Sequence, residues 1–171
     1  KTLKADYQVW CLATLKDGTL VSAGDDGNMS IWNTETSKVV RNLKGHTWRI
    51  YSLKVLKNGN LASGSADNTI KIWNTQSGDI LRTCEGHKGC VWTLEELNDD
   101  GLLVSGSDDK TVKMWDLKTG DLLKTSVEMP NSVYKLALLR DYNLAIQCYD
   151  FTQIIIVNGK TLKEVRRIDC G

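Results

Sequence analysis

Two histidines and three Asp-Asp pairs are the residues of this sequence that could perform chemistry. His46 and His87 could act as general bases or metal ligands, because imidazole titrates near neutral pH and commonly binds metals. Paired carboxylates could ligate calcium, but none of these pairs has the spaced ligands of a calcium loop. We expect all three to be solvated turns. The pairs are Asp25-Asp26, Asp99-Asp100 and Asp108-Asp109.

Motifs for other chemistry are missing from the sequence. It contains no G-x-S-x-G nucleophile turn, no H-E-x-x-H zinc motif and no glycine-rich loop that would hold a phosphate. We therefore expect no catalysis, no cofactor and no bound metal.

Composition and charge narrow the class of protein further. Twenty-two Lys and Arg residues balance twenty-one Asp and Glu residues, so the chain lacks the positive charge that attracts nucleic acids and anionic membranes. Apolar runs such as 154–157 are far shorter than the ~20 residues of a membrane-spanning helix. Five cysteines, an odd number without a C-x-x-C pair, favour a reduced compartment. We expect an intracellular protein, with the cytoplasm favoured and the nucleus left open.

The elements that position these residues follow from a repeat. Trp32, Trp73 and Trp115 are spaced by 41 and 42 residues, and the pairs Gly45-His46 and Gly86-His87 are 41 residues apart. A fixed period of this length is typical of repeat architectures. The chain divides into four units, 5–45, 46–86, 87–128 and 129–171, of which the last is degenerate.

Each unit is expected to form four short strands. In unit two, strands are predicted at 50–55, 61–64, 69–73 and 79–83, separated by turns rich in Gly, Asn and Asp. No window favours an amphipathic helix of useful length. The predicted fold class is therefore all-β, with four antiparallel sheets of four strands.

The repeat resembles that of the WD40 family. The resemblance is carried by Gly-His, by Ser-Gly-Ser-x-Asp at 63–67 and 105–109, and by strand ends at 31–33, 72–74 and 114–116. It implies a β-propeller, in which four-stranded blades are arranged radially around a channel. Because four units are fewer than the family's usual seven or eight blades, we expect a segment of a longer array. Residues 1–4 are similar to the end of a preceding fourth strand. A closed ring of four blades and a homodimer that completes eight blades remain alternatives.

The resemblance also implies a hydrogen-bonded Trp, Ser, His and Asp tetrad within each blade. The two complete sets are Trp73, Ser63, His46 and Asp67 in unit two, and Trp115, Ser105, His87 and Asp109 in unit three. Unit one keeps Trp32, Ser22 and Asp26 but has Ala5 in the His position. Unit four keeps only Asp150, with Met129 for His, Ile146 for Ser, and Ile156 or Val157 for Trp. We therefore interpret both histidines as internal braces of a sheet rather than as catalytic bases or ligands.

The resemblance also implies where partners bind. The binding surface is a rim of the propeller at the start of each first strand, and each unit contributes three residue positions to it. The first positions are all aromatic: Trp10, Tyr51, Trp92 and Tyr134. The second are Gln8, Arg49, Cys90 and Ser132, and the third are Asp25, Ala66, Asp108 and Tyr149. The predicted partner-binding residues are Trp10, Tyr51, Trp92, Tyr134, Arg49, Gln8, Asp25, Asp108 and Tyr149, because aromatics and Arg dominate protein interfaces. Packing between blades is the competing explanation for the aromatics.

These observations predict a non-catalytic scaffold that binds peptides or domains of other proteins, and neither nucleic acid nor membrane. The alternatives are an accessory regulatory module of a larger protein and a propeller hydrolase. We expect further blades or a second copy to be needed to cover the ends of the array.

Overall fold

The computed structural model describes residues 2–97, 101–150 and 152–170, and within these ranges it contains sixteen strands in four sheets. Asp99-Asp100 lies outside the described residues. Blade one consists of β1 (Val9–Thr14), β2 (Leu20–Gly24), β3 (Asn28–Asn33) and β4 (Lys38–Lys44). Blade two consists of β5 (Ile50–Val55), β6 (Leu61–Ser65), β7 (Ile70–Trp73) and β8 (Ile80–Cys84). Blade three consists of β9 (Val91–Leu97), β10 (Leu102–Ser107), β11 (Val112–Asp116) and β12 (Leu122–Thr125). Blade four consists of β13 (Val133–Leu138), β14 (Asn143–Cys148), β15 (Gln153–Asn158) and β16 (Glu164–Asp169).

Every sheet is an antiparallel meander whose strands pair in chain order. The predicted all-β fold class is therefore confirmed. Residues 2–5 belong to none of the four sheets, and the expectation that they form the end of the fourth strand of a preceding blade stays a prediction. No third strand lies beside them to complete a ladder. The described residues include no helix able to span a bilayer.

The turn between the second and third strands is built in the same way in three blades. One residue of each turn has the left-handed backbone that this tight reversal requires: Gly27 (φ 74°), Asn68 (φ 68°) and Lys110 (φ 63°). Asp26, Asp67 and Asp109 come just before these residues, and their carboxylates accept backbone N–H groups two residues ahead. The local sequence therefore fixes the acidic residue at the end of the blade.

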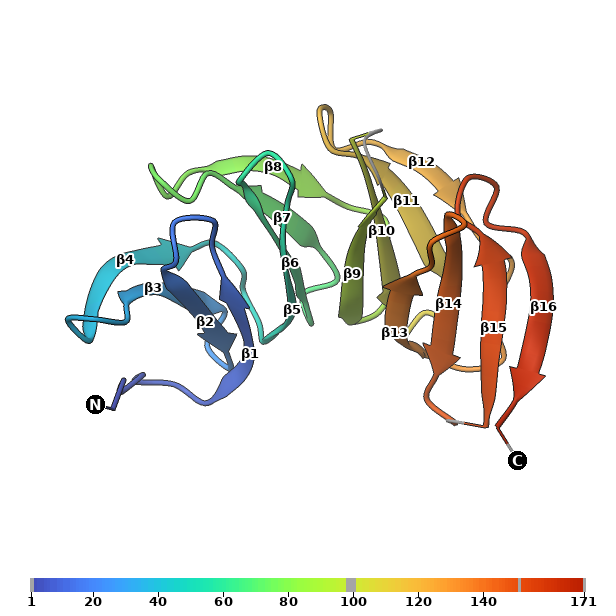
Figure 1. Ribbon diagram of the computed structural model, residues 1–171, viewed down its shortest axis with the longest axis horizontal. Coiled ribbons are helices and arrows are strands. Elements are labelled where there is room, and N and C mark those ends of the chain that lie inside the picture. Colours follow the sequence, from blue (N-terminus) through green and yellow to red (C-terminus); the bar gives the residue numbers. More distant parts are fainter. Residues whose placement is uncertain (1, 98–100, 151, 171) are drawn as a thin grey trace.

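The four blades form an open arc (Figure 1). The first strands β1, β5, β9 and β13 line the inner side of the arc, and the fourth strands lie outside. Blades one and four lie at opposite ends, so the four blades do not close into a ring. The structure is that of a partial propeller.

The hydrophobic core consists of three clusters, one in each space between neighbouring blades. Glycines permit the close approach of the blades. A Cβ on Gly106 would lie 2.3 Å from Val133 Cγ1, and one on Gly64 would lie 2.7 Å from Val91 Cγ1. The first strands of blades three and four therefore pack directly on the backbone of the preceding second strand. This contact holds the inner strands side by side.

Candidate functional site

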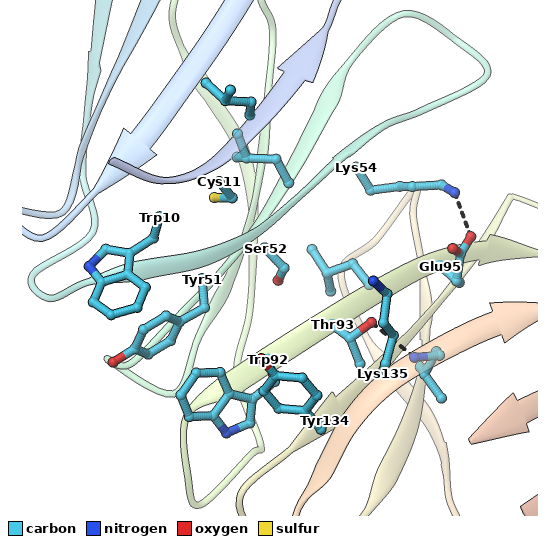
Figure 2. A pocket seen from close by; sticks show the side chains of 14 residues that line it. Trp10, Cys11, Tyr51, Ser52, Lys54, Trp92, Thr93, Glu95, Tyr134 and Lys135 are labelled. Atoms are coloured by element: carbon cyan, nitrogen blue, oxygen red, sulfur yellow. Dashed lines mark hydrogen bonds and ion pairs between the residues drawn. The ribbon is translucent and has the colours of Figure 1, made fainter. Parts of the chain in front are cut away.

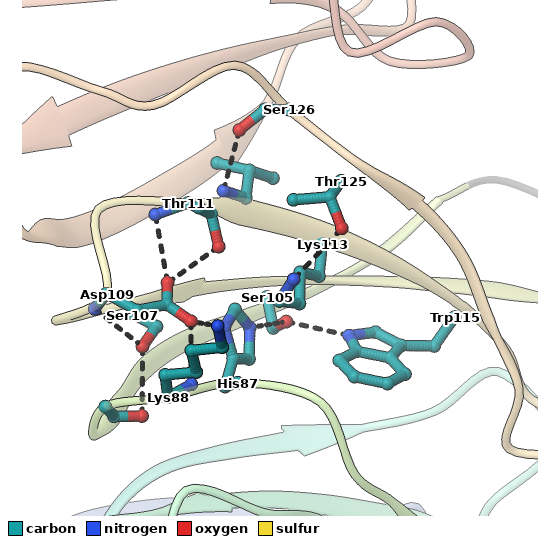
Figure 3. Close-up of polar contacts among 12 residues, drawn as sticks. His87, Lys88, Ser105, Ser107, Asp109, Thr111, Lys113, Trp115, Thr125 and Ser126 are labelled. Atoms are coloured by element: carbon teal, nitrogen blue, oxygen red, sulfur yellow. Dashed lines mark hydrogen bonds and ion pairs between the residues drawn. The ribbon is translucent and has the colours of Figure 1, made fainter.

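The tetrads of blades two and three are continuous hydrogen-bonded chains. In blade three, Trp115 Nε1 donates to Ser105 Oγ at 2.8 Å, and Ser105 Oγ contacts His87 Nε2 at 2.7 Å (Figure 3). His87 Nδ1 lies 2.7 Å from Asp109 Oδ2, which also accepts Lys88 N–H. Because a carboxylate only accepts, the imidazole donates from Nδ1 and the serine hydroxyl donates to Nε2. In blade two the same contacts measure 2.7–2.8 Å, and they join Trp73, Ser63, His46 and Asp67.

The tetrads are internal, and their surroundings shift the pKa values of Asp67, His87 and Asp109. The side chains of both histidines are fully buried. Burial lowers the pKa of His87, although the neighbouring Asp109 opposes this shift. Burial alone would raise the pKa of Asp109, but hydrogen bonds from His87 and Thr111 outweigh it and hold this pKa well below its ordinary value. The pKa of Asp67 is lowered in the same way through His46 and Thr69. The blade-three tetrad thus contains a neutral imidazole beside a carboxylate.

In blade one a tyrosine takes over the contact of the missing histidine. Tyr7 OH lies 2.7 Å from Ser22 Oγ and donates to Ser22 O at 2.9 Å. Trp32 Nε1 donates to the same Ser22 hydroxyl at 2.7 Å. Asp26 stays at the turn and binds Asn28. From the sequence, only Ala5 was considered for the histidine position. The signal that was missed is Tyr7, an aromatic residue with a hydroxyl group two residues later.

Blade four replaces the tetrad with apolar packing. Met129, Ile146 and Val157 are buried in one hydrophobic cluster. The register settles which residue replaces the tryptophan: Val157 pairs with Leu144, just as Trp115 pairs with Leu103, whereas Ile156 lies on the other face of the sheet. Asp150, the remaining polar member, is exposed. Among the described residues, no group of three or more His, Cys, Asp or Glu side chains could hold a metal ion.

The aromatic first-strand residues sit at β-bulges. The strand pairing shifts at this position in every blade, between Val9 and Cys11, between Ile50 and Ser52, opposite Gly106 and Ser107, and between Val133 and Lys135. The skipped residues are Trp10, Tyr51, Trp92 and Tyr134. A bulge redirects the side chain of its extra residue. The four rings therefore leave the alternation of the strand and gather on one rim of the arc.

Together these rings form a continuous row (Figure 2). The centroid of Tyr51 lies 5.7 Å from that of Trp10 and 4.1 Å from that of Trp92, with which it is stacked. Tyr134 lies 5.9 Å from Trp92 and 6.4 Å from Tyr149, which adds a fifth ring. We call Trp10, Tyr51, Trp92, Tyr134 and Tyr149 the aromatic row. Trp10, Tyr134 and Tyr149 are 49%, 40% and 61% exposed, so the row is packed within itself and open at both ends.

Backbone contacts bring the other two rim positions together in all four blades. The carbonyl of each second position accepts the N–H of the third at 2.8–3.1 Å. The pairs are Gln8 with Asp25, Arg49 with Ala66, Cys90 with Asp108, and Ser132 with Tyr149. The structure thus places all nine residues of the predicted binding set on one rim.

Both rim acids are bound to an indole. Trp10 Nε1 donates to Asp25 Oδ1 at 2.8 Å, and Trp92 Nε1 donates to Asp108 Oδ1 at 2.7 Å. Arg49 Nε lies 2.7 Å from the same Asp25 oxygen. Hydrogen bonding to Tyr51 and the charge of Asp25 raise the pKa of the Arg49 guanidinium. The carboxylates therefore fix the orientation of the two tryptophans.

A groove of about 510 Å³ runs below the aromatic row, between the inner strands of all four blades. Its floor carries an ion pair, with Lys54 Nζ 2.5 Å from Glu95 Oε2. Ser52 lines the groove, and its buried hydroxyl has no hydrogen-bond partner in the structure. The lining of the groove therefore combines apolar, polar and charged residues.

One exposed aromatic beside the rim was missed at the sequence level. Trp48 is 61% exposed and lines a smaller hollow with Asp25, Asp26 and Arg49. The repeat gives no signal for it, because Gly89 stands at the equivalent position of the next unit.

The radial four-stranded blades, the internal tetrads and the aromatic rim define a β-propeller of the repeat type. A protein-family model described as "WD domain, G-beta repeat" matches residues 1–33, 37–74 and 78–116, so the chain belongs to the WD40 repeat family. The match ends before blade four, where the tetrad is replaced. No curated protein matches the chain.

A solved structure titled "Structure of U3-55K" has the same fold, with a TM-score of 0.87. The sequence identity is 22%, and the match covers 96% of this chain and 53% of that one. The chain therefore spans about half the length of that protein. At this identity the likeness concerns the fold alone.

Proposed function

We propose that the chain is a non-catalytic interaction scaffold that binds peptide segments or domains of other proteins on its aromatic row. The single observation that supports this best is the row itself: five rings from four blades meet on one rim, above an open groove. WD40 repeats generally form protein-interaction scaffolds. Large aromatic side chains supply most of the binding free energy at protein interfaces.

The balance between binding and packing favours binding at the ends of the row. Trp10 and Tyr149 are about half exposed or more, whereas rings that only fill the space between blades would be covered, as Trp73 and Trp115 are. Tyr51 and Trp92 lie in the middle of the row and stack on each other, so they contribute to packing between blades as well as to the binding surface.

An enzymatic role is disfavoured by the environment of the rim carboxylates. Asp25 and Asp108 belong to blades one and three, and each accepts an indole N–H. A hydrolase of this fold would need acids that converge on one point. An accessory module within a larger protein remains the second candidate, since the matched solved protein is about twice as long. An intracellular location is also part of the proposal, supported by five free cysteines.

Peptide selection followed by affinity measurement tests the proposed function. A displayed peptide library is selected on the 171-residue chain, and the enriched peptides are measured by fluorescence anisotropy. Trp10→Ala and Trp92→Ala should each weaken binding at least about tenfold, the loss typical of a central interface aromatic. The melting temperature of Trp10→Ala should fall by only about 3 °C, because this half-exposed side chain contributes roughly 1 kcal/mol.

Leu123→Ala is the matched control, since Leu123 is 48% exposed on the outer strand β12, away from the rim. It should bind like the wild type. Unchanged affinity in both tryptophan variants, together with a large loss of stability, would show that the row only packs the blades.

A further inference from the structure

The aspartate of the blade-one tetrad accepts fewer hydrogen bonds than its counterparts. Asp67 and Asp109 each accept four, from the histidine, from the backbone N–H after it, and from the N–H and hydroxyl of the threonine two residues ahead. Within the described part of the chain, Asp26 accepts two, both from Asn28, at 3.0 Å and 2.7 Å. Its carboxylate therefore keeps acceptor capacity that the complete tetrads use internally.

The same carboxylate is open to solvent. Asp26 is exposed, whereas the side chains of the two tetrad aspartates in blades two and three are each 10% exposed. Blade one has no histidine to cover it, and the hydroxyl of Tyr7 binds Ser22 instead of the aspartate. Donors from another molecule can therefore reach Asp26.

An exposed indole lies beside this carboxylate. Trp48 belongs to the loop that leads from β4 to β5, and it lines a hollow of about 360 Å³. The other lining residues are Asp25, Asp26, Thr47 and Arg49. Gly27 permits the close approach of the two loops, because its backbone is left-handed (φ 74°) and a Cβ there would lie 3.0 Å from the carbonyl oxygen of Trp48. The hollow thus lies on the rim between blades one and two, away from both ends of the array.

The charges around the hollow favour a cation. Arg49 Nε lies 2.7 Å from Asp25 Oδ1, so these two charges compensate each other. Both donors to Asp26 come from Asn28, which is neutral, so the charge of Asp26 is left over. A cation placed here would interact with the carboxylate and with the indole of Trp48 at the same time.

We propose that this hollow binds an arginine side chain of a partner peptide. A planar guanidinium stacks on an indole and donates two parallel hydrogen bonds to a carboxylate, whereas the ammonium group of lysine is a compact point charge. The hollow adjoins the aromatic row, because Asp25 also accepts the N–H of Trp10. The inference rests on the proposed function for its peptide: a segment bound along the row extends one arginine to Asp26 and Trp48.

Blade four offers a matched control position. Asp150 stands at the tetrad position of that blade and is exposed like Asp26, but Asn131 occupies the place of Trp48. A change at Asp150 therefore removes the same charge from the same rim and leaves the hollow intact.

Titration of the 171-residue chain with Nα-acetyl-L-arginine methylamide, followed by nuclear magnetic resonance, tests the site without a peptide. The indole N–H signal of Trp48, assigned by its loss in Trp48→Leu, should shift as the probe binds. The citrulline analogue, which is neutral and has nearly the same shape, should leave this signal in place. These two probes separate the charge of the side chain from its size.

Variants of the hollow should weaken binding of the arginine probe, measured through the backbone amide signals of the loop at 47–49. Asp26→Ser should raise the dissociation constant about fivefold, because it removes an exposed ion pair while its hydroxyl can still accept the Asn28 N–H. Trp48→Leu should raise it about threefold through the lost cation–π contact. Asp150→Ser should bind like the wild type, and circular dichroism establishes that each variant keeps its fold.

Three results would overturn the inference: an arginine probe that shifts no signal of the hollow, a citrulline probe that binds equally well, or equal effects of Asp26→Ser and Asp150→Ser. The peptides selected on the chain distinguish this failure from that of the proposed function. Peptides that bind the aromatic row but tolerate citrulline in place of every arginine overturn the arginine site alone. A chain that binds the arginine probe but selects no peptide overturns the proposed function and leaves an arginine site.

Discussion

A single serine oxygen lies at the centre of each complete tetrad. Ser105 Oγ accepts from Trp115 Nε1 and donates to His87 Nε2, and all three groups are buried. Removing the oxygen leaves two buried polar atoms without a partner, and the cost of desolvating such groups exceeds the net value of a satisfied hydrogen bond. The tetrad therefore acts as one unit that joins the third strand to the loop before the blade.

Ser105→Ala should lower the free energy of unfolding by about 3 kcal/mol, since it strands both the indole N–H and the imidazole nitrogen. Urea denaturation monitored by tryptophan fluorescence measures the change. Ser77→Ala provides the comparison, because Ser77 is exposed at a turn and its removal should cost less than about 0.5 kcal/mol. Equal losses in the two variants would mean that the tetrad does not brace the blade.

The sequence allowed the complete tetrads to be predicted because their four residues recur at fixed spacing. Tyr7 could not be predicted, since its hydroxyl reaches Ser22 only through the path of the backbone before β1. The indole contacts of the rim leave a partial signal: Asp25 and Asp108 stand in the units that have Trp10 and Trp92, while the units with a tyrosine have no acid there. The pairing of each acid with a tryptophan could be interpreted as a hydrogen bond only once the distances between the indole nitrogens and the carboxylate oxygens were known.

At the scale of elements, bulges and glycines determine how the blades meet. The predicted strands of unit two agree with β5 to β8 within one residue, because turn residues mark their ends. The bulges were not predicted, since a shift in pairing does not alter the order of apolar and polar residues. They nevertheless decide which side chains reach the rim.

Gly106→Ala should destabilise the protein by about 2 kcal/mol, the cost of overpacking a closed interface. The new methyl group would lie 2.3 Å from Val133 Cγ1 and 2.8 Å from Thr93 Cγ2, so blades three and four would have to separate. Thermal unfolding followed by circular dichroism measures this loss.

Gly101→Ala is the control for that experiment, because a Cβ there meets nothing within 4 Å and only the left-handed backbone (φ 64°) is strained. Its cost should be about 1 kcal/mol. If Gly106→Ala were no worse than this control, the close contact of β10 with β13 would not limit the packing of the blades.

At the scale of the whole molecule, stability is unevenly distributed along the arc. Repeat proteins gain much of their stability from interfaces between neighbouring units. Blades two and three have such an interface on both faces, whereas blades one and four have it on one face only. The end blades should therefore open more readily than the middle ones.

Amide hydrogen exchange at low protein concentration should be slowest in β6, β7, β10 and β11, and about tenfold or more faster in β1 and β2. The reason is that Val9 and Leu12 are exposed, while in the other blades the counterparts of Val9 are fully buried and those of Leu12 are at least partly buried. Uniform exchange along the chain would contradict the uneven distribution of stability.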